Sequence, residues 1–541
     1  MVTTINLAII IFASATSFLY WLKKPVHGTT IAITPSYILF CAGVFILSVP
    51  LLWTPANWIS TAVMRSACLV AGCGFLLIIM QLKHSHLVVG LYLVTLASSV
   101  QAIFACQQLM IPQSPWFPLY SDRLYGSFFQ PNLLASYLAT GIAVSWALLL
   151  PFFCLRSPGY ERWRRSGLLI AIILQSAVLV LTQSRTGFLG IVCVVIFFSC
   201  LQWKTSSSTV VRGVLAVISG LILGGLFLLH GEDYIELRTG HHSNLARWSM
   251  LKDTLSMILE KPVSGWGYGG FEFSFQHFRV NQSVPTIVTE ITRHPHNEIL
   301  YWLAEGGLIA LCGMLLIIYG LSKIATGIFR FENRSVISDG SSKGISLSIG
   351  VALVPVIIHT QLEYPLYISA LHCVTFVFLL GFVTQCSQNI IPIKQISVIY
   401  SIKLFCIIKA FSVMFIFGFA LYGHIVLSDA ENFRMEDMTT VNTLPEPVQW
   451  ILSERVNFDK NVNILLRYNS THDEALLYEY RLWAEDYLER RIDQNVYANL
   501  ISILHHQKRF AEYNFYLREA SAFFPRDARF DVGTFHDGKH L

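Results

Sequence analysis

The sequence predicts an all-α, polytopic integral membrane protein with a soluble helical domain at its C-terminus. Of the 541 residues, 54% are hydrophobic and only 13% are charged, and the mean hydropathy is +0.54. This composition excludes an ordinary soluble enzyme. A bilayer-crossing helix needs roughly 20 mostly apolar residues, and about twelve such segments precede residue 428, where charged residues become frequent.

Each apolar segment is expected to form one crossing. The segments lie at residues 5–22, 31–53, 61–82, 87–110, 131–155, 167–183, 187–203, 213–230, 297–322, 344–358, 366–388 and 403–427. The first lacks a preceding basic region and a cleavage site, so we interpret it as a retained helix. Pro35, Pro50 and Pro55 are expected to shorten or break the helices around them.

Basic residues orient these segments, because loops rich in Lys and Arg stay on the cytoplasmic side. The strongest signals are Arg156 to Arg165, Lys204 to Arg212, Lys323 to Lys343, and Lys394 with Lys403. The opposite, periplasmic face then receives the stretches near Gln130 and Arg185, the loop at 231–296 and the turn at 359–365. The side of the N-terminus stays open. Because topology explains the basic residues, the net charge of +5 gives no case for nucleic-acid binding.

Two units are expected: a transmembrane core at residues 1–427 and an accessory domain at residues 428–541. The same alternation of sides places the second unit in the periplasm. Helical periodicity in 474–491, 495–507 and 509–523 resembles a tetratricopeptide-like hairpin. A packing appendage and a module that binds an acceptor or partner are both compatible with this pattern.

A polar cluster lies at the mouth of the apolar segment that starts at residue 297. Arg293-His294-Pro295-His296-Asn297-Glu298 places two imidazoles, a carboxylate and a guanidinium there. Burying unpaired ionisable groups is costly, so such clusters usually mark function. The preceding loop at 231–296 is long enough to be functional itself. Its glycine-rich stretch at 265–270 follows a helix-stopping proline and lacks the features of a phosphate-binding loop.

Several short motifs follow one another in a recognisable order. They are Ser-Arg-Thr-Gly around Arg185, Arg247-Trp248 with Pro262-x-x-Gly265-Trp266-Gly267, and His-Pro-His-Asn-Glu at 294–298 with Glu305-Gly306-Gly307. Together they resemble the O-antigen ligase and polymerase superfamily. Gln130-Pro131-Asn132, His359 to Pro365 with Glu363-Tyr364, and the charged C-terminal unit resemble one branch, the bacterial protein O-oligosaccharyltransferases of the PglL type. The resemblance extends from about residue 110 into the C-terminal unit.

This resemblance implies a glycosyltransferase of the bacterial inner membrane. It implies transfer of a preassembled glycan from an undecaprenyl-diphosphate carrier to Ser or Thr hydroxyls of an exported protein such as a pilin. The partners would be the lipid-linked donor, the acceptor protein and the bilayer, and neither a cofactor nor a metal ion is expected.

The resemblance also suggests roles for individual residues. Arg185 and Arg247 match positions that would hold the diphosphate, for which guanidinium groups are well suited. His296 matches the family histidine, and an imidazole is a suitable general base for a hydroxyl nucleophile. Attack on the anomeric carbon opposite the diphosphate would invert its configuration.

Gln130, Asn132, Glu363 and Tyr364 are expected to bind the sugar or the acceptor. For each candidate a simpler role stays open. Gln130 and Asn132 can serve the start of a helix around Pro131, Glu363 can pair with a loop arginine, and Tyr364 can join the interfacial aromatic belt. Arg185 can snorkel at a helix end, and Arg247 can solvate its loop.

The choice between the two histidines is open in the same way. His296 can be incidental to a helix start that Asn297 caps. His294 competes with it for the role of base, although Pro295 separates the two rings and favours a structural role for His294.

The acceptor also stays open. An O-antigen ligase acting on lipid A-core and an O-antigen polymerase would use the same core residues. A transporter of lipid-linked glycans is an alternative of another class. Its ionisable residues would lie at mid-membrane depth in broken helices, whereas the candidates here gather in loops and at helix ends.

Overall fold

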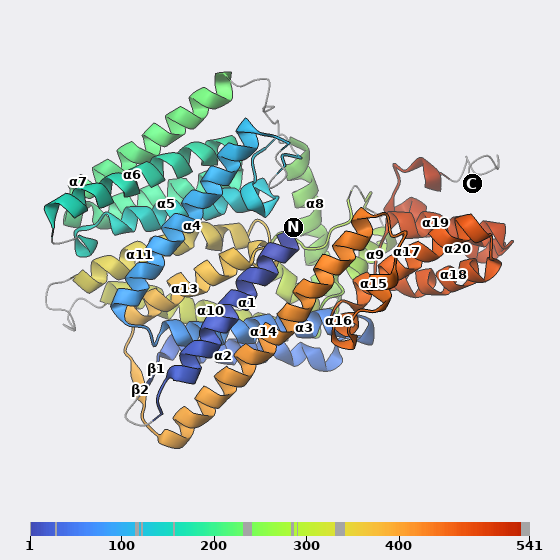
Figure 1. The fold of residues 1–541 in the computed structure, drawn as a ribbon, viewed down its shortest axis with the longest axis horizontal. Coiled ribbons are helices and arrows are strands. Elements are labelled where there is room, and N and C mark those ends of the chain that lie inside the picture. Colours follow the sequence, from blue (N-terminus) through green and yellow to red (C-terminus); the bar gives the residue numbers. More distant parts are fainter. Residues whose placement is uncertain are drawn as a thin grey trace.

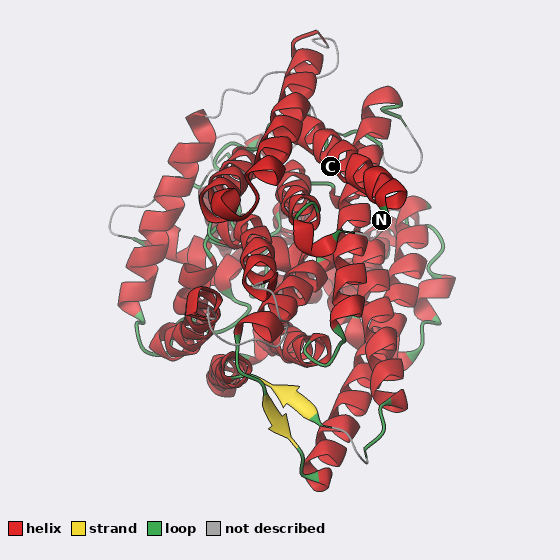
Figure 2. Cartoon of the chain, turned by 90° about the vertical axis from the view of Figure 1, so that its left-hand side faces the viewer, coloured by secondary structure: helices red, strands yellow, loops and turns green. Residues whose placement is uncertain are grey.

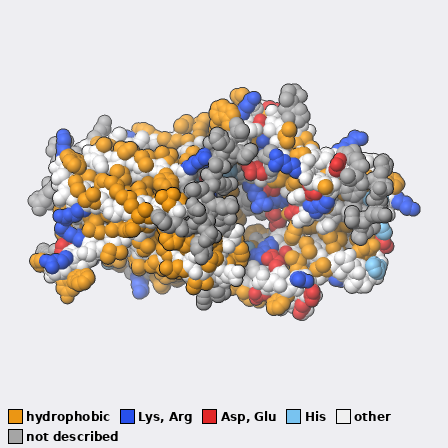
Figure 3. Space-filling model, turned by 90° about the horizontal axis from the view of Figure 1, so that it is seen from above, with side chains coloured by type: hydrophobic (Ala, Val, Ile, Leu, Met, Phe, Trp, Pro, Cys, Tyr) orange, Lys and Arg blue, Asp and Glu red, His pale blue; other side chains and the backbone are white. Residues whose placement is uncertain are grey.

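The computed structural model describes residues 2–26, 30–113, 118–120, 123–154, 157–230, 241–282, 286–288, 290–330 and 341–531. Almost all regular structure in these ranges is helical, which confirms the predicted all-α class. Nine helices of the described part are long and apolar enough to cross a membrane. Figure 3 shows a broad band of hydrophobic side chains over the left half of the molecule, with basic side chains at its left end.

The helices of the apolar part are numbered in chain order (Figure 1). They are α1 (Val2–Lys23), α2 (Pro35–Ser48), α3 (Ile59–Ile79), α4 (His84–Met110), α5 (Pro131–Leu148), α6 (Pro158–Leu181), α7 (Arg185–His230), α8 (His241–Glu260), α9 (Phe271–Asn281), α10 (Glu298–Arg330), α11 (Ser341–Thr360), α12 (Pro365–Ile368), α13 (Ala370–Ser387) and α14 (Ile396–Asn432). The later helices are α15 (Thr439–Asn442), α16 (Glu446–Ile451), α17 (Ser453–Thr471), α18 (Glu474–Leu488), α19 (Gln494–His506) and α20 (Phe510–Phe523).

Each predicted apolar segment coincides at least in part with a helix. The segments 187–203 and 213–230 both fall in α7, whose backbone leaves helical geometry at Ser206 (φ −157°, ψ 65°). The segment 131–155 falls on α5, and the segment 344–358 falls on the shorter apolar helix Gly344–Thr360. Neither of these helices is among the nine that are long and apolar enough to cross a membrane. The predicted segments therefore outnumber the nine helices.

The segment predicted at 31–53 differs from the structure at both ends. Its first residues form strand β1 (Ile31–Ile33), which pairs antiparallel with β2 (Ile391–Ile393), a two-stranded ribbon that sequence analysis missed (Figure 2). The helix starts at Pro35, where the Thr34 hydroxyl accepts the Tyr37 amide. It ends near Pro50 in a 3-10 turn. Prolines therefore set the helix limits, as expected.

Helix α5 is the centre of the bundle. All its residues from Leu133 to Leu148 are buried, and α4, α6, α7 and α11 pack around it. A helix that is apolar on every side is stable only in such a position. Because its start at Pro131 is fixed by this packing, the polar residues before and after that proline are held in place.

Helix α10 is broken after its first turns by an unusual glycine conformation. Gly307 has φ 61° and ψ −157°, a region that side chains other than glycine essentially do not occupy. The glycine-rich loop docks against this break: Trp266 N–H donates to the Ala304 carbonyl at 3.0 Å, and Leu308 N–H donates to the Pro262 carbonyl at 2.9 Å. The Gly-Trp-Gly and Glu-Gly-Gly motifs thus form one interlocked unit.

A buried ion pair closes this unit. Arg65 of α3 lies 2.6 Å from the Glu305 carboxylate, which also accepts the amides of Gly269 and Phe271 at 3.0 and 3.1 Å. The Arg65 guanidinium lies over the ring of Tyr301, 4.9 Å from its centroid. The pair therefore joins α3, the glycine-rich loop and α10.

Replacement of Gly307 by Ala is expected to destabilise the protein. An added Cβ would lie 2.1 Å from the Val263 carbonyl oxygen, and an alanine in this backbone conformation adds strain of about 1–3 kcal/mol. Thermal unfolding of the purified protein in detergent measures the loss. Gly418→Ala is the control, because nothing lies within 4 Å of a Cβ there. Equal midpoints for the two variants would contradict the prediction.

The C-terminal helices follow α14 without a break at residue 427, because α14 continues to Asn432. Consecutive helices from α17 to α20 pack on one another around a hydrophobic core. This group also touches the long loop, since His277 of α9 lies 3.0 Å from the Glu519 carboxylate of α20. The division into two units and the tetratricopeptide-like character of the second unit stay predictions.

Candidate active site

The carboxylate of Glu363 is the meeting point of the candidate residues. It accepts hydrogen bonds from Gln130 Nε2 at 3.0 Å and from Asn132 Nδ2 at 2.5 Å. Arg247 of α8 donates to it at 2.8 Å, and His359 Nε2 lies 3.3 Å away. Four of the seven predicted site residues, counting Glu363 itself, are therefore brought into direct contact from α5, α8 and the turn after α11.

Local structure explains why the two amides reach Glu363. Gln130 and Pro131 start α5 as expected, but the Gln130 side chain makes no capping hydrogen bond. Pro131 lacks an amide hydrogen, so the first turn has one donor fewer to satisfy. The amide groups on either side of it are then free to bind the carboxylate. Pro131 starts the helix, as the simpler interpretation expected, and binding of a sugar or an acceptor by the two amides stays a prediction.

Burial and hydrogen bonding oppose each other at Glu363, which is only 3% exposed. Burial raises the pKa of its carboxyl. The hydrogen bond from His359, the charge of Arg247 and the Asn132 amide lower this pKa by a larger amount, so that it lies below its usual value. Glu363 is therefore ionised at neutral pH. A carboxylate that accepts four donors suits the holding of a cation better than proton abstraction.

Behind Glu363 a chain of buried polar side chains continues into the bundle. His359 Nδ1 lies 2.7 Å from the Ser136 hydroxyl, which lies 3.1 Å from His372 Nε2. His372 Nδ1 in turn lies 2.8 Å from the Ser369 hydroxyl. Sequence analysis did not assign these residues. The four-residue spacing of His359 and Glu363 was the signal available for His359.

Arg123 is a second residue that sequence analysis missed. Its guanidinium donates to the Asn132 Oδ1 atom at 3.0 Å and to the Thr182 carbonyl at 2.7 Å. It thereby fixes the amide orientation that points the Asn132 nitrogen at Glu363. An arginine is uncommon in a loop predicted to be periplasmic. This unusual position was the feature of the sequence that could have identified Arg123.

His296 lies in the turn before α10 with a left-handed backbone (φ 56°). Its Nδ1 atom lies 3.3 Å from the Leu362 carbonyl, next to Glu363. A carbonyl only accepts, so this contact places the ring proton on Nδ1 and leaves Nε2 as a proton acceptor. Burial, together with the charges of Arg247 and His294, keeps the pKa of His296 below its usual value despite Glu363. The imidazole is neutral at pH 7, as a general base requires.

His294 has contacts of a different kind. Its Nδ1 atom accepts the backbone amide of His296 at 3.0 Å, and its ring packs on Tyr301 and Tyr364 at centroid distances of 4.4 and 4.8 Å. Burial lowers the pKa of His294 despite Glu298 nearby. The two imidazole rings lie 6.5 Å apart. His294 is thus placed to hold the turn that presents His296.

Asn297 and Glu298 support the same turn. The Asn297 Oδ1 atom accepts the Leu300 amide at 3.0 Å, so this residue caps α10, as the simpler interpretation expected. The Glu298 carboxylate accepts from Trp302 at 2.7 Å and from the Tyr367 hydroxyl at 2.6 Å. These contacts tie the start of α10 to the turn that carries Glu363.

Tyr364 lies beside this cluster, and Arg185 lies at the same end of the bundle. The Tyr364 ring lies 5.6 Å from that of His296, and burial together with Glu363 raises the pKa of its hydroxyl. Arg185 starts α7 with an exposed side chain. The start of α7 lies against α5, because a Cβ on Gly187 would lie 2.4 Å from the Ala135 Cβ. Arg185 therefore occupies the same end of the bundle as Gln130.

The cluster described so far is rich in donors and poor in grouped metal ligands. Within the described ranges, no three or more His, Cys, Asp or Glu side chains are arranged to hold a metal ion. Residues 231–240, 283–285 and 289 of the predicted loop lie outside the described part.

Two protein families match different parts of this chain. The family described as O-antigen ligase matches residues 170–315, which include Arg185, Arg247 and His296. The family described as virulence factor membrane-bound polymerase, C-terminal, matches residues 349–533, which include Glu363. The matches support membership of the O-antigen ligase and polymerase superfamily. No curated protein matches the sequence. The two matches support a glycosyltransferase-like activity at a lipid bilayer, of the kind found among O-antigen ligases and polymerases.

Proposed function

We propose that the protein transfers a preassembled glycan from undecaprenyl diphosphate to Ser or Thr hydroxyls of exported proteins such as pilins. The observation that carries the proposal is the contact of Arg247 with the Glu363 carboxylate, beside the neutral imidazole of His296. A fixed cation and a proton acceptor at one end of a membrane bundle are the groups that this transfer needs. The superfamily membership supports it further.

Arg247 and Arg185 would stabilise the leaving diphosphate. Arg247 is 37% exposed and uses its Nη2 atom for Glu363. A guanidinium carries five N–H donors in a planar fork, so the remaining edge is suited to phosphate oxygens while Glu363 keeps the group in place. Arg185 would add a second cation from the start of α7. Gln130, Asn132 and Tyr364 would line the sugar and acceptor site.

His296 would activate the acceptor. Its Nε2 atom takes the hydroxyl proton as the acceptor oxygen forms a bond to the anomeric carbon. The bond from that carbon to the diphosphate oxygen breaks, and the electron pair leaves with the diphosphate. Attack and departure on opposite faces invert the anomeric configuration, and no step in this sequence calls on a metal ion.

The second candidate function differs from the first in its acceptor. An O-antigen ligase that loads lipid A-core, or a polymerase that joins repeat units, would use the same groups, and the two family matches favour this alternative directly. In each case we propose that the site and the C-terminal helices face the periplasm from the inner membrane, as the basic loops predict.

The acceptor is tested by reconstitution. Purified protein is mixed with an undecaprenyl-diphosphate glycan and, in parallel, with a pilin or with lipid A-core. Glycosylated pilin, detected by its increase in mass, is the expected product. Product on lipid A-core without product on any protein would establish the alternative. No product with either acceptor, from a donor that a known ligase accepts, would overturn the proposed transfer.

A further inference from the structure

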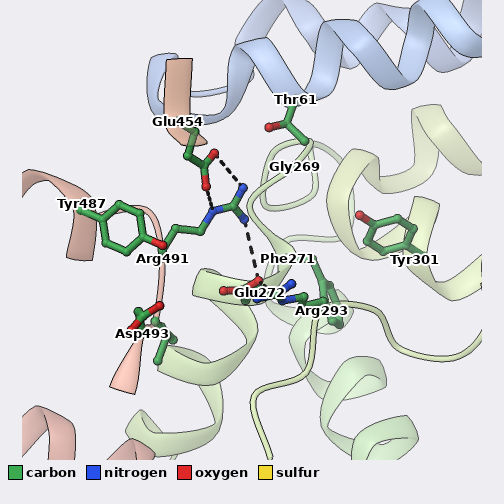
Figure 4. Close-up of a pocket in the computed structure, with 11 residues that line it drawn as sticks. Thr61, Gly269, Phe271, Glu272, Arg293, Tyr301, Glu454, Tyr487, Arg491 and Asp493 are labelled. Atoms are coloured by element: carbon green, nitrogen blue, oxygen red, sulfur yellow. Dashed lines mark hydrogen bonds and ion pairs between the residues drawn. The ribbon is translucent and has the colours of Figure 1, made fainter. Parts of the chain in front are cut away.

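A cavity of about 340 Å³ lies between the C-terminal helices, the long loop and the start of α3 (Figure 4). Its lining comes from Thr61 of α3, from Gly269, Phe271, Glu272, Arg293 and Tyr301, and from Glu454, Tyr487, Arg491, Ile492 and Asp493. Three separate parts of the chain therefore build one space. Its volume lies at the small end of the range for ligand sites in proteins.

The charged groups of the lining hold one another in place. The Arg491 guanidinium donates to both carboxylate oxygens of Glu454, at 2.7 and 3.1 Å, and lies 3.8 Å from Glu272. Arg293 Nε lies 3.0 Å from the same Oε2 atom of Glu272. Figure 4 shows Arg491 between the two carboxylates, with the Tyr487 ring beside it. Polar groups held in this way keep their geometry before a ligand arrives.

We propose that this cavity is a saccharide subsite. Three carboxylates face two guanidinium groups in the lining, so the charges nearly cancel and favour a neutral ligand. A sugar hydroxyl both donates and accepts hydrogen bonds, and the lining alternates carboxylate acceptors with guanidinium donors. The ring of Tyr487 adds an apolar surface against which a sugar ring can pack. A peptide would instead need apolar pockets and free backbone partners.

The place of the cavity relates it to the candidate reaction centre. Tyr301 lines it, and the same ring packs on His294 at 4.4 Å. Arg293 lines it as well and stands three residues before His296. The C-terminal helices contribute the far wall. A glycan with its reducing sugar at His296 would therefore extend along the turn toward this space, a step that rests on the proposed function.

Direct binding tests the subsite without the need for transfer. Saturation-transfer NMR of the full chain in nanodiscs is recorded with N,N′-diacetylchitobiose, with maltotriose and with an uncharged Ser/Thr-rich hexapeptide. We expect binding of at least one saccharide, and about tenfold weaker binding in the double variant Arg293→Gln, Tyr487→Phe, which removes one or two hydrogen bonds. Arg490→Gln is the matched control, since Arg490 pairs with Asp486 outside the cavity.

A blocking variant provides the second measurement. Thr61→Trp fills the cavity from the exposed first turns of α3 and is expected to abolish saccharide binding while the thermal midpoint stays unchanged. Saccharide binding that survives both Thr61→Trp and the double variant would overturn the proposal, as would binding of the hexapeptide alone. Failure of the transfer assay with intact saccharide binding would overturn the proposed function and leave the subsite standing.

Kinetics distinguish the two sources of saccharide. If the subsite holds the donor glycan, the double variant raises KM for a donor with the full glycan and leaves KM unchanged for a donor with one sugar on the diphosphate. If it holds an acceptor glycan, KM rises for that acceptor with both donors. Unchanged KM values throughout would contradict a role in transfer.

Discussion

Replacement of His296 by Gln is expected to lower the rate of glycan transfer by about 10²–10⁴-fold, the usual contribution of a positioned general base. The amide keeps a donor for the Leu362 carbonyl, which accepts from the imidazole now, but it has no basic nitrogen. The protein should therefore fold and insert normally. Initial rates at saturating donor, combined with the thermal midpoint of the purified variant, measure the two effects separately.

The pH profile provides an independent readout of the same base. The pKa of His296 lies below its ordinary value of 6.5, and only the neutral ring accepts a proton. Activity should be constant above pH 7 and fall with acidification, with the midpoint of kcat/KM below 6.5. His294→Gln is the control, since its ring holds the turn. If that variant loses the acidic limb and His296→Gln retains it, the two roles are exchanged.

Replacement of Glu363 by Ala is expected to have the second largest effect. It removes the acceptor of four donors and leaves His359, which is fully buried, without this partner. Removal of one member of a buried pair costs roughly 3–5 kcal/mol. Arg247 also loses the contact that positions it, so transfer should fall even among folded molecules. The transfer rate of the Arg247→Lys variant should also fall, because an ammonium group lacks the planar fork of donors that a guanidinium has.

Glu161→Gln is the matched control for Glu363. Glu161 is a buried carboxylate in the first turn of α6 that binds Arg164 and Arg165. It lies in the stretch Arg156 to Arg165, which is predicted to face the cytoplasm. Its replacement should lower the thermal midpoint without changing the rate per folded molecule. Equal losses of rate in the two variants would show that Glu363 acts through stability alone.

Much of the fold was predictable from periodicity and composition. Apolar length located each helix that is long and apolar enough to cross a membrane, because a bilayer leaves the backbone few other ways to satisfy its hydrogen bonds. The division of α7 followed from the polar residues around Ser206, which interrupt the apolar run. The β1–β2 ribbon was not predictable, because three-residue strands carry no measurable period and their pairing joins residues 31 and 393.

The candidate site was predictable as a set of residues and not as a network. Resemblance named Gln130, Asn132, Arg247 and Glu363 one by one, and the structure shows that the first three each donate to the carboxylate of the fourth. His372 could not be found in this way, since a lone histidine in an apolar segment has no spacing to mark it. Its contact with Ser136 depends on the packing of α13 against neighbouring helices, which only tertiary structure specifies.

Helix α14 has a consequence for the movement of the C-terminal helices. At 1.5 Å per residue, its 37 residues span about 55 Å, well beyond the roughly 30 Å of bilayer hydrocarbon. The helix is continuous to Asn432 and leads directly into the C-terminal helices, so the length beyond the hydrocarbon is a stiff link to them (Figure 1). The C-terminal helices at the end of this link contact α9 through His277 and Glu519. The stiffness of one helix thus limits how freely the C-terminal helices can move relative to the apolar bundle.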